Sequence, residues 1–450
     1  MAHSLRARAR RLAQVAGRLA VLGASLSCLV ALLTPAGARA AEPGSPPRPP
    51  ACRELEPGAD LAQELRALPE GGALCLAPGA YQGPLRLEAG RTLWGPRSAV
   101  IRSAGEGTTV ELVGQAAALL GVSVDGSGGR FDLMDAAVAV RADDARVEGV
   151  EVRNALFGLL AERSNRVVLR GNRIVGDADS PLGMRGDGVR LWEVRGSRIE
   201  DNQLEDSRDM VVWYASGNRI AGNRVVGGRY GTHLMYSHDN TLEGNLYDRN
   251  VVGVFVMYSR NVVLRRNQLL RSSGAAGMGI GLKESGNIHA EENLFAGNQV
   301  CLYTDTSPLS LDELNRFESN WFRSCGTAVV FHGGAERNHF AGNSFRDNAV
   351  QVAVEGRGDA QQAEWRGNDF DDYAGYDLDA DGVGDLPYEL RSLSGELTGR
   401  HPSLAFFRGA PAMALVELVG RVVPLFRPTT LLVDSEPRMR PHALPQADAS

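Results

Sequence analysis

Residues 219–267 read RIAGNRVVGGRYGTHLMYSHDNTLEGNLYDRNVVGVFVMYSRNVVLRRN, and this stretch decides the predicted fold. Within it, three segments end in the same way, each in an asparagine. These ends are Ile-Ala-Gly-Asn223, Leu-Glu-Gly-Asn245 and Leu-Arg-Arg-Asn267, and their asparagines are 22 residues apart. An asparagine with the same surroundings recurs outward in both directions, at intervals of 21 to 30 residues, at Asn172, Asn202, Asn293, Asn320, Asn343 and Asn368. A repeat of this length that tolerates small insertions predicts a solenoid.

The residues between the asparagines indicate which solenoid it is. Leucine-rich repeats have a similar length, but here Val and Ile alternate in short runs and no helical stretch lies between them. We therefore predict an all-β fold, a right-handed parallel β-helix with three short strands in each coil. The aligned asparagines are expected to hydrogen-bond along the axis as an amide ladder. About 23 residues in a coil give roughly 12 or 13 coils and a rod about 60 Å long.

The ends of the rod and the flanking segments divide the chain into five predicted parts. Residues 1–40 form a signal peptide, and residues 41–97 form an N-terminal cap with the first coil. Residues 98–375 form the coils, 376–400 an acidic calcium-type loop, and 401–450 a C-terminal docking tail. The cap is expected to contain a short amphipathic helix at residues 60–68, because open sheet edges need to be covered.

The N-terminus predicts export to the periplasm. Arg6, Arg8, Arg10 and Arg11 form a positive region ahead of an apolar run at residues 19–33, and Ala38-Arg39-Ala40 has the form of a cleavage site. The net charge of the chain is −6, and removal of residues 1–40, with six arginines and no acidic residue, leaves −12. An acidic chain without a Lys/Arg cluster argues against nucleic acid as a partner.

Four cysteines remain after the leader, and an exported chain is expected to oxidise them to two disulfides. Cys52 and Cys75 would fix the cap. Cys301 and Cys325 are 24 residues apart, one coil, so they could stack within the Cα distance that a disulfide requires. The alternative for this second pair is two buried free thiols.

Alternation along the strands predicts a soft, aromatic outer face. Counting back from each asparagine places Val189, Leu191, Thr232 and Leu234 inward. The intervening side chains point outward, and they would form a contiguous exposed patch beside three stacked tyrosines. The patch comprises Trp192, Trp213, His233, Met235, Phe255 and Met257, and the tyrosines that flank it are Tyr214, Tyr236 and Tyr258. Such a patch indicates a surface for a partner or ligand; the alternative is that a loop or the C-terminal tail covers it.

Two metal sites are predicted from residue type and spacing. His233, Met235 and Met257 are ligands of the kind that Cu(I) takes, and the two methionines are one coil apart. Asp377, Asp379, Asp381 and Asp385 occupy positions 1, 3, 5 and 9 of a calcium-type loop, with Gly382 at position 6. The first set could equally be packing residues, and the second could be a merely acidic turn.

Catalysis has weaker support in the sequence. Parallel β-helices often act on polysaccharides with paired carboxylates, and Asp187, Asp206 and Asp209 lie near equivalent corners, as do Arg185, Arg208 and Arg229. Asp and Arg are also ordinary corner residues. No catalytic residue is therefore assigned, and the chain is expected to be a scaffold rather than an enzyme.

Two passages resemble the NosD family of nitrous oxide reductase maturation proteins, which are pectin-lyase-like β-helices. The first runs from Arg229-Tyr-Gly-Thr-His233-Leu-Met-Tyr-Ser237 to Met257-Tyr-Ser259, and the second runs from Asp372-Tyr-Ala-Gly-Tyr-Asp377 to Asp385-Leu-Pro-Tyr388. The likeness continues into the tail, with His401-Pro402-Ser403-Leu404 and Val433-Asp434-Ser-Glu-Pro437. It covers nearly the whole mature chain.

The resemblance implies a periplasmic protein of denitrification, associated peripherally with an inner-membrane complex. The implied partners are an ABC-type ATPase with its membrane subunit, a lipoprotein copper chaperone and nitrous oxide reductase, whose copper centres the protein helps to assemble. Two alternatives remain from the residues themselves: an exported polysaccharide-active enzyme, and a metal-binding protein without partners.

Overall fold

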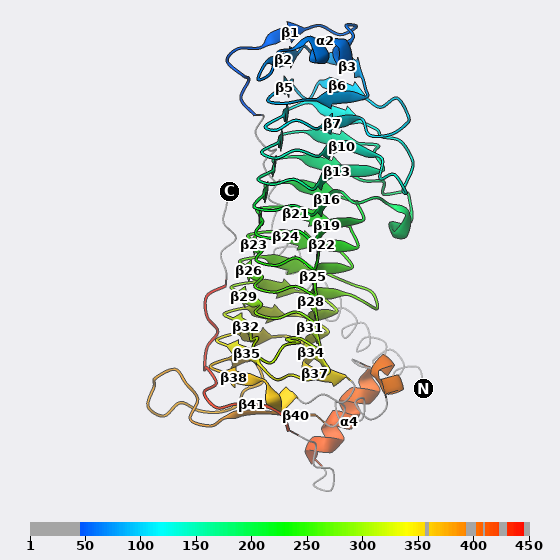
Figure 1. The fold of residues 1–450 in the computed structure, drawn as a ribbon. Helices are drawn as coiled ribbons and strands as arrows, with labels where there is room; N and C mark the ends of the chain where they lie inside the picture. The colour runs from blue at the N-terminus through cyan, green and yellow to red at the C-terminus, as the bar shows by residue number, and fades with distance from the viewer. Residues whose placement is uncertain (1–45, 356–359, 393–401, 408–409, 423–429, 445–450) are drawn as a thin grey trace, which may run out of the picture. The chain divides into compact units, whose positions relative to one another are not determined.

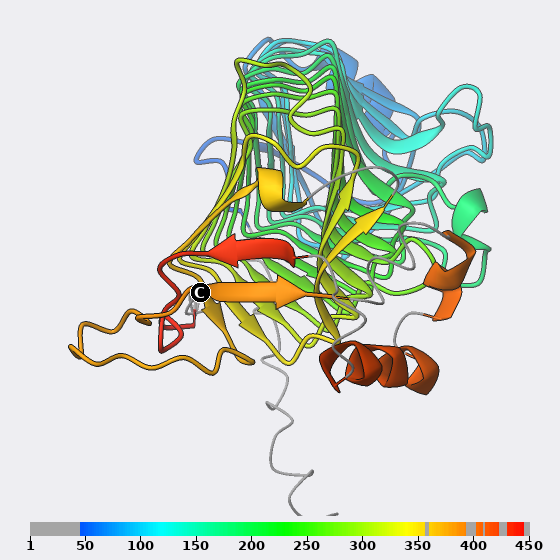
Figure 2. The same cartoon turned by 90° about the horizontal axis from the view of Figure 1, so that it is seen from below.

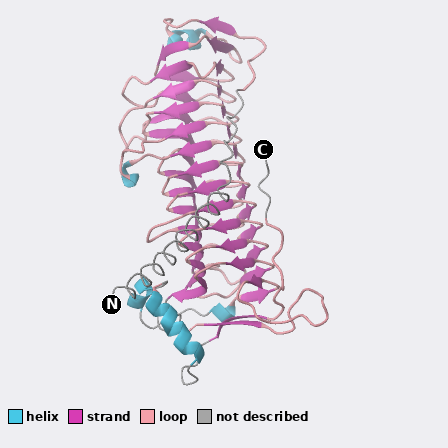
Figure 3. Ribbon diagram, turned by 180° about the vertical axis from the view of Figure 1, so that it is seen from behind, coloured by secondary structure: helices cyan, strands magenta, loops and turns pink. Residues whose placement is uncertain are grey.

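A computed structural model of the chain describes residues 46–355, 360–392, 402–407, 410–422 and 430–444. The predicted signal peptide lies outside these residues. The described residues belong to one compact unit, and almost all of their regular structure consists of short strands stacked in coils (Figures 1 and 3). The parallel β-helix predicted from the asparagine spacing is confirmed.

Three parallel sheets form the walls of the solenoid, and each complete coil contributes one strand to each wall. Sheet A has 14 strands, in the order β1 (Arg53–Leu55), β2 (Ala73–Leu76), β5 (Thr92–Trp94), β8 (Ala118–Leu120), β11 (Arg146–Glu148), β14 (Val168–Arg170), β17 (Arg198–Glu200), β20 (Arg219–Ala221), β23 (Thr241–Glu243), β26 (Val263–Arg265), β29 (His289–Glu291), β32 (Asn315–Glu318), β35 (Asn338–Ala341) and β38 (Glu364–Arg366).

Sheet B follows sheet A in each coil. It has 13 strands, in the order β3 (Gly79–Gln82), β6 (Ala99–Arg102), β9 (Ser123–Asp125), β12 (Glu151–Arg153), β15 (Arg173–Val175), β18 (Gln203–Glu205), β21 (Arg224–Val226), β24 (Leu246–Asp248), β27 (Gln268–Leu270), β30 (Leu294–Ala296), β33 (Trp321–Arg323), β36 (Ser344–Arg346) and β39 (Asp369–Phe370).

Sheet C completes the coil and has the longest strands. Its 12 strands are, in chain order, β4 (Leu85–Leu87), β7 (Val110–Leu112), β10 (Ala136–Val140), β13 (Phe157–Glu162), β16 (Val189–Trp192), β19 (Asp209–Trp213), β22 (Tyr230–Met235), β25 (Val252–Met257), β28 (Met278–Lys283), β31 (Val300–Asp305), β34 (Thr327–His332) and β37 (Val350–Glu355). Seen along the coils, the strands of the three sheets superimpose into three walls (Figure 2).

The asparagine ladder runs through the corner between sheets A and B. Asn245 is typical: its side-chain oxygen accepts hydrogen bonds from the backbone and side-chain nitrogens of Asn223, at 2.9 and 3.0 Å. Its side-chain nitrogen donates to Ile220 O and to Asn267 Oδ1, both at 2.9 Å. Gly244, just before it, has a φ of +61°, which a glycine adopts without steric cost. The ladder therefore satisfies buried polar groups that the sharp corner would otherwise leave unpaired.

The three sheets have 14, 13 and 12 strands, close to the predicted 12 or 13 coils, and parallel pairing starts before the first asparagine marker. β1, β2 and β5 already stack in register in the segment predicted as cap and first coil. The predicted helix is present as α2 (Leu61–Ala67), with Asp60 accepting a hydrogen bond from Gln63 N at 2.9 Å. Its buried Leu61 and Leu65 pack into the core, so α2 covers the first coils.

Helices and a short hairpin-like sheet complete the described residues. The single-turn helices are η1 (Leu182–Met184), η2 (Ala360–Gln362) and η3 (Pro402–Phe407), and the longer helix near the C-terminus is α4 (Pro411–Val422). β40 (Tyr388–Arg391) and β41 (Thr430–Asp434) pair antiparallel beyond the last coil. Within the described residues, none of the helices has the length and apolarity needed to cross a membrane.

Both cysteine pairs are bonded. The Cα atoms of Cys52 and Cys75 are 5.7 Å apart, and this bond links β2 to the segment before β1. The Cα atoms of Cys301 and Cys325 are 6.1 Å apart, which is close to the spacing of stacked coils. The disulfides thus fix the capped first coils and one corner far along the solenoid.

Candidate functional site

Five neighbouring strands of sheet C, β16, β19, β22, β25 and β28, form the wall that carries the predicted soft face. Their registers pair Trp192 with Trp213, Trp213 with Met235, and Met235 with Met257. The alternate side chains point inward and are fully buried: Val189, Leu191, Met210, Val212, Thr232, Leu234, Val254, Val256, Ile280 and Leu282. The predicted inward and outward positions are therefore those of the structure.

Aromatic side chains line the outer face along the direction of the solenoid. Trp192 contacts Trp213 and Tyr214, with ring centroids 6.0 and 5.2 Å apart. Tyr214, Tyr236 and Tyr258 follow their strands at φ near +50° and stack on one another, with centroids 5.4 and 4.9 Å apart. Tyr214 and Tyr236 are each 42% exposed. The tyrosine stack thus forms an accessible edge beside the more protected tryptophans.

The exposure predicted for this patch needs correction at its centre. His233 is only 6% exposed, and Trp192, Trp213, Met235, Phe255 and Met257 are half-buried. The imidazole of His233 packs against three rings, those of Trp213, Phe255 and Tyr230, with centroids 5.5, 6.0 and 4.7 Å away. Because large neighbouring rings cover each other, the face is a packed cluster rather than an open apolar surface. We call His233, Met235 and Met257 with these rings the soft cluster.

Tyr230 belongs to this cluster although strict alternation from His233 would turn it inward. The pairing of β19 with β22 shifts register between Asp209 and Val211, so the extra residue in β22 resets the alternation. Tyr230 therefore lies on the outer face, and Arg229 lies 4.6 Å above its ring. The only signal in the sequence is that β22 has one more residue than β19 between corresponding corners.

His233 is positioned to act as a neutral nitrogen ligand. Its Nε2 lies 3.2 Å from Met257 Sδ, and Trp213 Nε1 donates a hydrogen bond to its Nδ1 at 3.4 Å. Burial lowers the pKa of His233 to about 4, although the charge of Asp209 opposes this shift. The imidazole is therefore uncharged at neutral pH. Imidazole and thioether donors in contact form a set that suits a soft ion such as Cu(I).

Charged residues at one end of the soft cluster form ion pairs with one another. Arg190 lies over the rings of Trp192 and Trp213, 5.4 and 4.7 Å from their centroids, and donates to Asp187 at 3.0 Å. Arg208 donates to the other oxygen of Asp187 at 2.8 Å. Burial raises the pKa of Asp187, against the opposing charge of Arg208. The ion pairs thus anchor a cation against the tryptophans.

The remaining carboxylates considered for catalysis are also engaged. Asp209 is buried, pairs with Arg229 and accepts a hydrogen bond from Tyr230 N at 3.1 Å. Asp206 lies 3.8 Å from Arg185, whose guanidinium mainly donates to backbone carbonyls such as Ser180 O. Asp187 borders a cavity of about 640 Å³, but its side chain has no exposed surface. These carboxylates act as structural ion-pair partners in this arrangement.

The acidic loop brings three of its four predicted ligands together. Oxygens of Asp377, Asp379 and Asp381 lie within 4.8 Å of one another. The carboxylate of Asp385 accepts a hydrogen bond from Leu378 N at 2.7 Å, and that of Asp377 accepts one from Gly382 N at 2.9 Å. The loop is therefore held by its own hydrogen bonds. Calcium binding there stays a prediction.

The fold and this site define a class of protein: a parallel β-helix that carries a soft, aromatic cluster on one wall. Residues 170–375, which include the cluster, match the family model described as periplasmic copper-binding protein (NosD). The probable ABC transporter binding protein NosD of Stutzerimonas stutzeri is 27% identical over 391 residues, which cover 81% of this chain and 86% of that protein. The protein of the same name from Pseudomonas aeruginosa is 28% identical over 399 residues, covering 82% and 88%. The chain is thus similar to NosD proteins over most of its length.

Solved structures agree on the fold. The catalytic unit of a GH87 α-1,3-glucanase from Streptomyces thermodiastaticus superimposes with a TM-score of 0.54 over 71% of this chain and 70% of its own. The two sequences are only 14% identical. This similarity extends to the β-helical architecture and not to the chemistry of the site.

Proposed function

We propose that the protein is a periplasmic accessory protein for nitrous oxide reductase maturation. In this role the β-helix is a scaffold that works with an ABC-type transporter and a copper chaperone to assemble the copper centres of the reductase. Support comes from the similarity to proteins named as ABC transporter binding proteins and from the copper-binding family that matches residues 170–375. The predicted cleavable leader agrees with a periplasmic location.

The observation that carries the proposal is the contact between His233 Nε2 and Met257 Sδ, 3.2 Å apart, with Met235 in register beside Met257. Thioethers and imidazole bind Cu(I) but offer little to the hard cations of the periplasm, Mg²⁺ and Ca²⁺. The surrounding rings limit access of water, and the low pKa of His233 leaves no proton charge to repel a cation. Copper here is cargo that the protein receives and passes on.

The hydrogen bond from Trp213 indicates how binding is linked to the aromatic wall. With Trp213 donating to Nδ1, the ring proton of the neutral imidazole lies on Nε2, facing Met257. A metal ion at Nε2 needs a free lone pair on that nitrogen, so the ring proton would move through solvent from Nε2 to Nδ1. Nδ1 would then be a donor and could no longer accept the hydrogen bond from Trp213. Copper uptake is therefore coupled to movement of the Trp213 side chain, and release restores the starting arrangement.

The tail supplies a second feature that suits docking. Helix α4 exposes Leu415 and Leu418, which are 60% and 56% accessible, together with Val419. A spacing of three and four residues places these side chains on one face of the helix. An exposed apolar stripe on a helix fits a membrane subunit or another hydrophobic groove in a partner.

Cu(I) binding should depend on the soft cluster. In a competition titration with a chromophoric Cu(I) chelator under reducing, anaerobic conditions, His233→Ala and Met257→Leu should each weaken binding by about tenfold or more. Copper should also change the fluorescence of Trp213, and Trp213→Phe should abolish that change. Met184→Leu is the matched control, since Met184 is exposed and lies on η1, outside the strands that carry the cluster. Equal affinity in all variants would remove the cluster as the copper site.

Partner capture should depend on α4. The tagged mature protein, recovered from membranes of its host grown under denitrifying conditions, should retain an ATPase, its membrane subunit and a lipoprotein copper chaperone. Leu415→Ser/Leu418→Ser should lose most of the retained material, whereas Leu378→Ser, an exposed leucine of the acidic loop, should not. Recovery of the wild-type rod alone would contradict the scaffold role and favour the polysaccharide-active alternative.

A further inference from the structure

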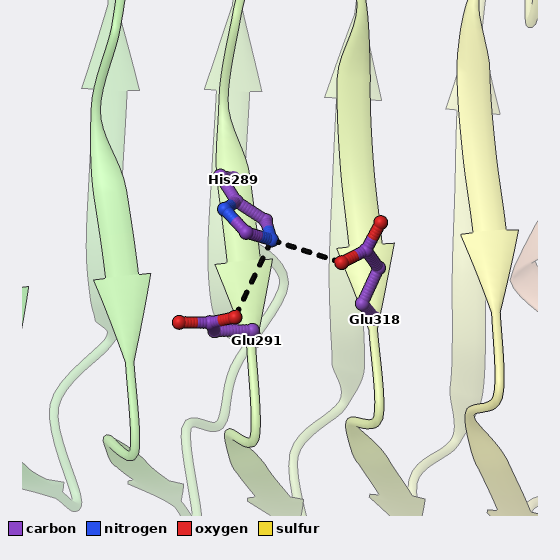
Figure 4. A group of neighbouring side chains, drawn as sticks. All are labelled: His289, Glu291 and Glu318. Carbon is purple, nitrogen blue, oxygen red and sulfur yellow. Dashed lines mark hydrogen bonds and ion pairs between the residues drawn. The ribbon is translucent and has the colours of Figure 1, made fainter.

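Sheet A carries a second group of metal-ligating side chains, on a different wall from the soft cluster. His289 and Glu291 project from β29, and Glu318 projects from the neighbouring strand β32 (Figure 4). His289 and Glu291 are two residues apart, so they point to the same face. Glu291 pairs with Glu318 in the strand register, which places their carboxylates side by side. One atom from each of the three side chains lies within 4.8 Å of the others.

The spacing of these atoms fits a single small cation. His289 Nε2 lies 3.1 Å from Glu318 Oε2 and 3.5 Å from Glu291 Oε2. Ligands about 2.0 to 2.1 Å from a tetrahedral Zn²⁺ are separated by about 3.3 Å, from the tetrahedral angle. Both distances from His289 Nε2 are close to this edge length, and the two carboxylate oxygens lie within 4.8 Å of each other, so small side-chain movements bring all three atoms onto one ion. All three side chains are half-buried, so a fourth position is accessible to solvent.

The charge balance at this place differs from the rest of the wall. Elsewhere on sheet A, arginines of the same or neighbouring strands pair with the glutamates: Glu148 pairs with Arg146 and Arg170, and Glu243 with Arg219 and Arg265. Where such an arginine would stand beside Glu318, the structure has the imidazole of His289.

Glu318 has no arginine partner in the part of the chain that the structure describes; its one ion-pair partner there is His289. Arg316 is exposed on the same strand and forms no ion pair with it within the same residues. Glu291 has only a distant arginine, with Arg265 at 3.7 Å. Two adjacent carboxylates with so little compensation favour a divalent cation between them.

The next histidine on the wall shows what an ordinary ion pair looks like. His339 of β35 lies 3.2 Å from Glu364 of β38, and no second carboxylate joins them among the described residues. One histidine and one glutamate give two ligands, which is too few for a stable zinc site. The third ligand is what distinguishes the group at β29 and β32, and it comes from the adjacent coil.

We propose that His289, Glu291 and Glu318 form a Zn²⁺ site that bridges two successive coils, with a solvent molecule as fourth ligand. Imidazole and carboxylate oxygens are zinc ligands, whereas Cu(I) prefers the sulfur donors of the soft cluster. The two sites therefore select different ions on different walls. Zinc binds through Nε2, so the bound ring is neutral with its proton on Nδ1. A doubly protonated imidazole releases its Nε2 proton to solvent, and a neutral ring protonated on Nε2 loses that proton to solvent and takes one up on Nδ1. The ion crosslinks β29 to β32 and neutralises the paired glutamates.

The test uses the mature protein without a polyhistidine tag, titrated with Zn²⁺ by calorimetry. Wild-type protein should bind one equivalent of Zn²⁺ at this site, and Glu318→Gln should weaken the affinity of that site by about tenfold or more. The matched control is Glu364→Gln, which removes the acid from the two-ligand pair and should leave the equivalent intact. His233→Ala should also leave it intact, which separates this site from the soft cluster.

Two further readouts distinguish an inner-sphere site from diffuse attraction of cations. Co²⁺ in place of zinc should give the visible absorption of a low-coordinate site in the wild type and in Glu364→Gln, and lose it in Glu318→Gln. Saturating Zn²⁺ should raise the thermal midpoint of the wild type and leave that of Glu318→Gln unchanged, because an ion bound to the native state stabilises it. Identical titrations for wild type and Glu318→Gln would overturn the proposal.

Discussion

Replacing Asn245 by alanine is expected to lower the free energy of unfolding by roughly 3 to 6 kcal/mol, since each buried polar group left unpaired costs about 1 to 3 kcal/mol. The substitution removes four hydrogen bonds at once. The backbone N–H of Asn223 and the carbonyl of Ile220 lose their partners inside a corner where water cannot replace them. The ladder should be interrupted, so the coils on either side lose coupling.

The measurement combines urea unfolding with hydrogen exchange. Unfolding gives the loss of stability, and the amide of Asn223 reports whether the loss is local to the interrupted corner, as expected for a repeat protein. Asn165→Ala is the control: the side chain of Asn165 donates to Asp143 at 3.0 Å, but the residue is only half-buried. That variant should cost less than about 1 kcal/mol. If both variants cost the same, the ladder is not a main source of stability.

The asparagine spacing was sufficient to predict the architecture because a solenoid repeats one local solution. Each Asn marks the same corner, and counting from it gives the alternation of the following strands, so Val189 and Leu234 are inward and Trp192 and Met235 outward in the structure. The first coils lack the marker, since no such asparagine follows β1, β2 or β5. Sheets of 14, 13 and 12 strands are nevertheless close to the predicted 12 or 13 coils.

Features that break the repeat were not predictable in this way. The register shift before Val211 brings Tyr230 onto the outer face, and the rings around His233 bury it. Neither follows from a period of two. The group of His289, Glu291 and Glu318 on sheet A could have been predicted from the sequence, because Glu291 and Glu318 both lie two residues before a ladder asparagine. Lining up that column places the two acids next to each other.

Replacing Asp434 by alanine should open the C-terminal end of the solenoid. This buried carboxylate accepts four hydrogen bonds: from Gly367 N at 3.1 Å, from Asn368 N at 2.9 Å and Nδ2 at 2.8 Å, and from Glu436 N at 3.0 Å. It thus occupies the place of the next asparagine oxygen in the ladder. Because bonds to a charged acceptor are worth about 1.5 to 3 kcal/mol each, and removal also relieves a buried charge, we expect a net loss of roughly 2 to 5 kcal/mol.

This role was not predictable from the repeat, because Asp434 lies 66 residues beyond Asn368 in a segment predicted as a docking tail. In the structure, residues 430–444 pack on the last coils instead. β41 pairs with β40, and Tyr388 of β40 stacks on Phe370 with centroids 3.9 Å apart, which extends the ladder of core phenylalanines. Further along, Trp321 donates to Ala443 O at 3.3 Å. Docking remains proposed for α4, while this later part of the tail closes the rod.

The Asp434→Ala protein, whose C-terminal end is open, should self-associate as well as lose stability. The exposed edge of β38 would present unpaired backbone groups, which favour edge-to-edge pairing between molecules. Light scattering coupled to gel filtration should therefore show dimers or larger species of Asp434→Ala at concentrations where the wild type gives a single size. Glu436→Ala is the matched control two residues away: it removes a surface pair with Arg366 at 2.9 Å and should change stability by less than about 1 kcal/mol. A stable Asp434→Ala protein with the wild-type size distribution would show that the apolar stack of Phe370 and Tyr388, rather than the carboxylate, holds the end closed.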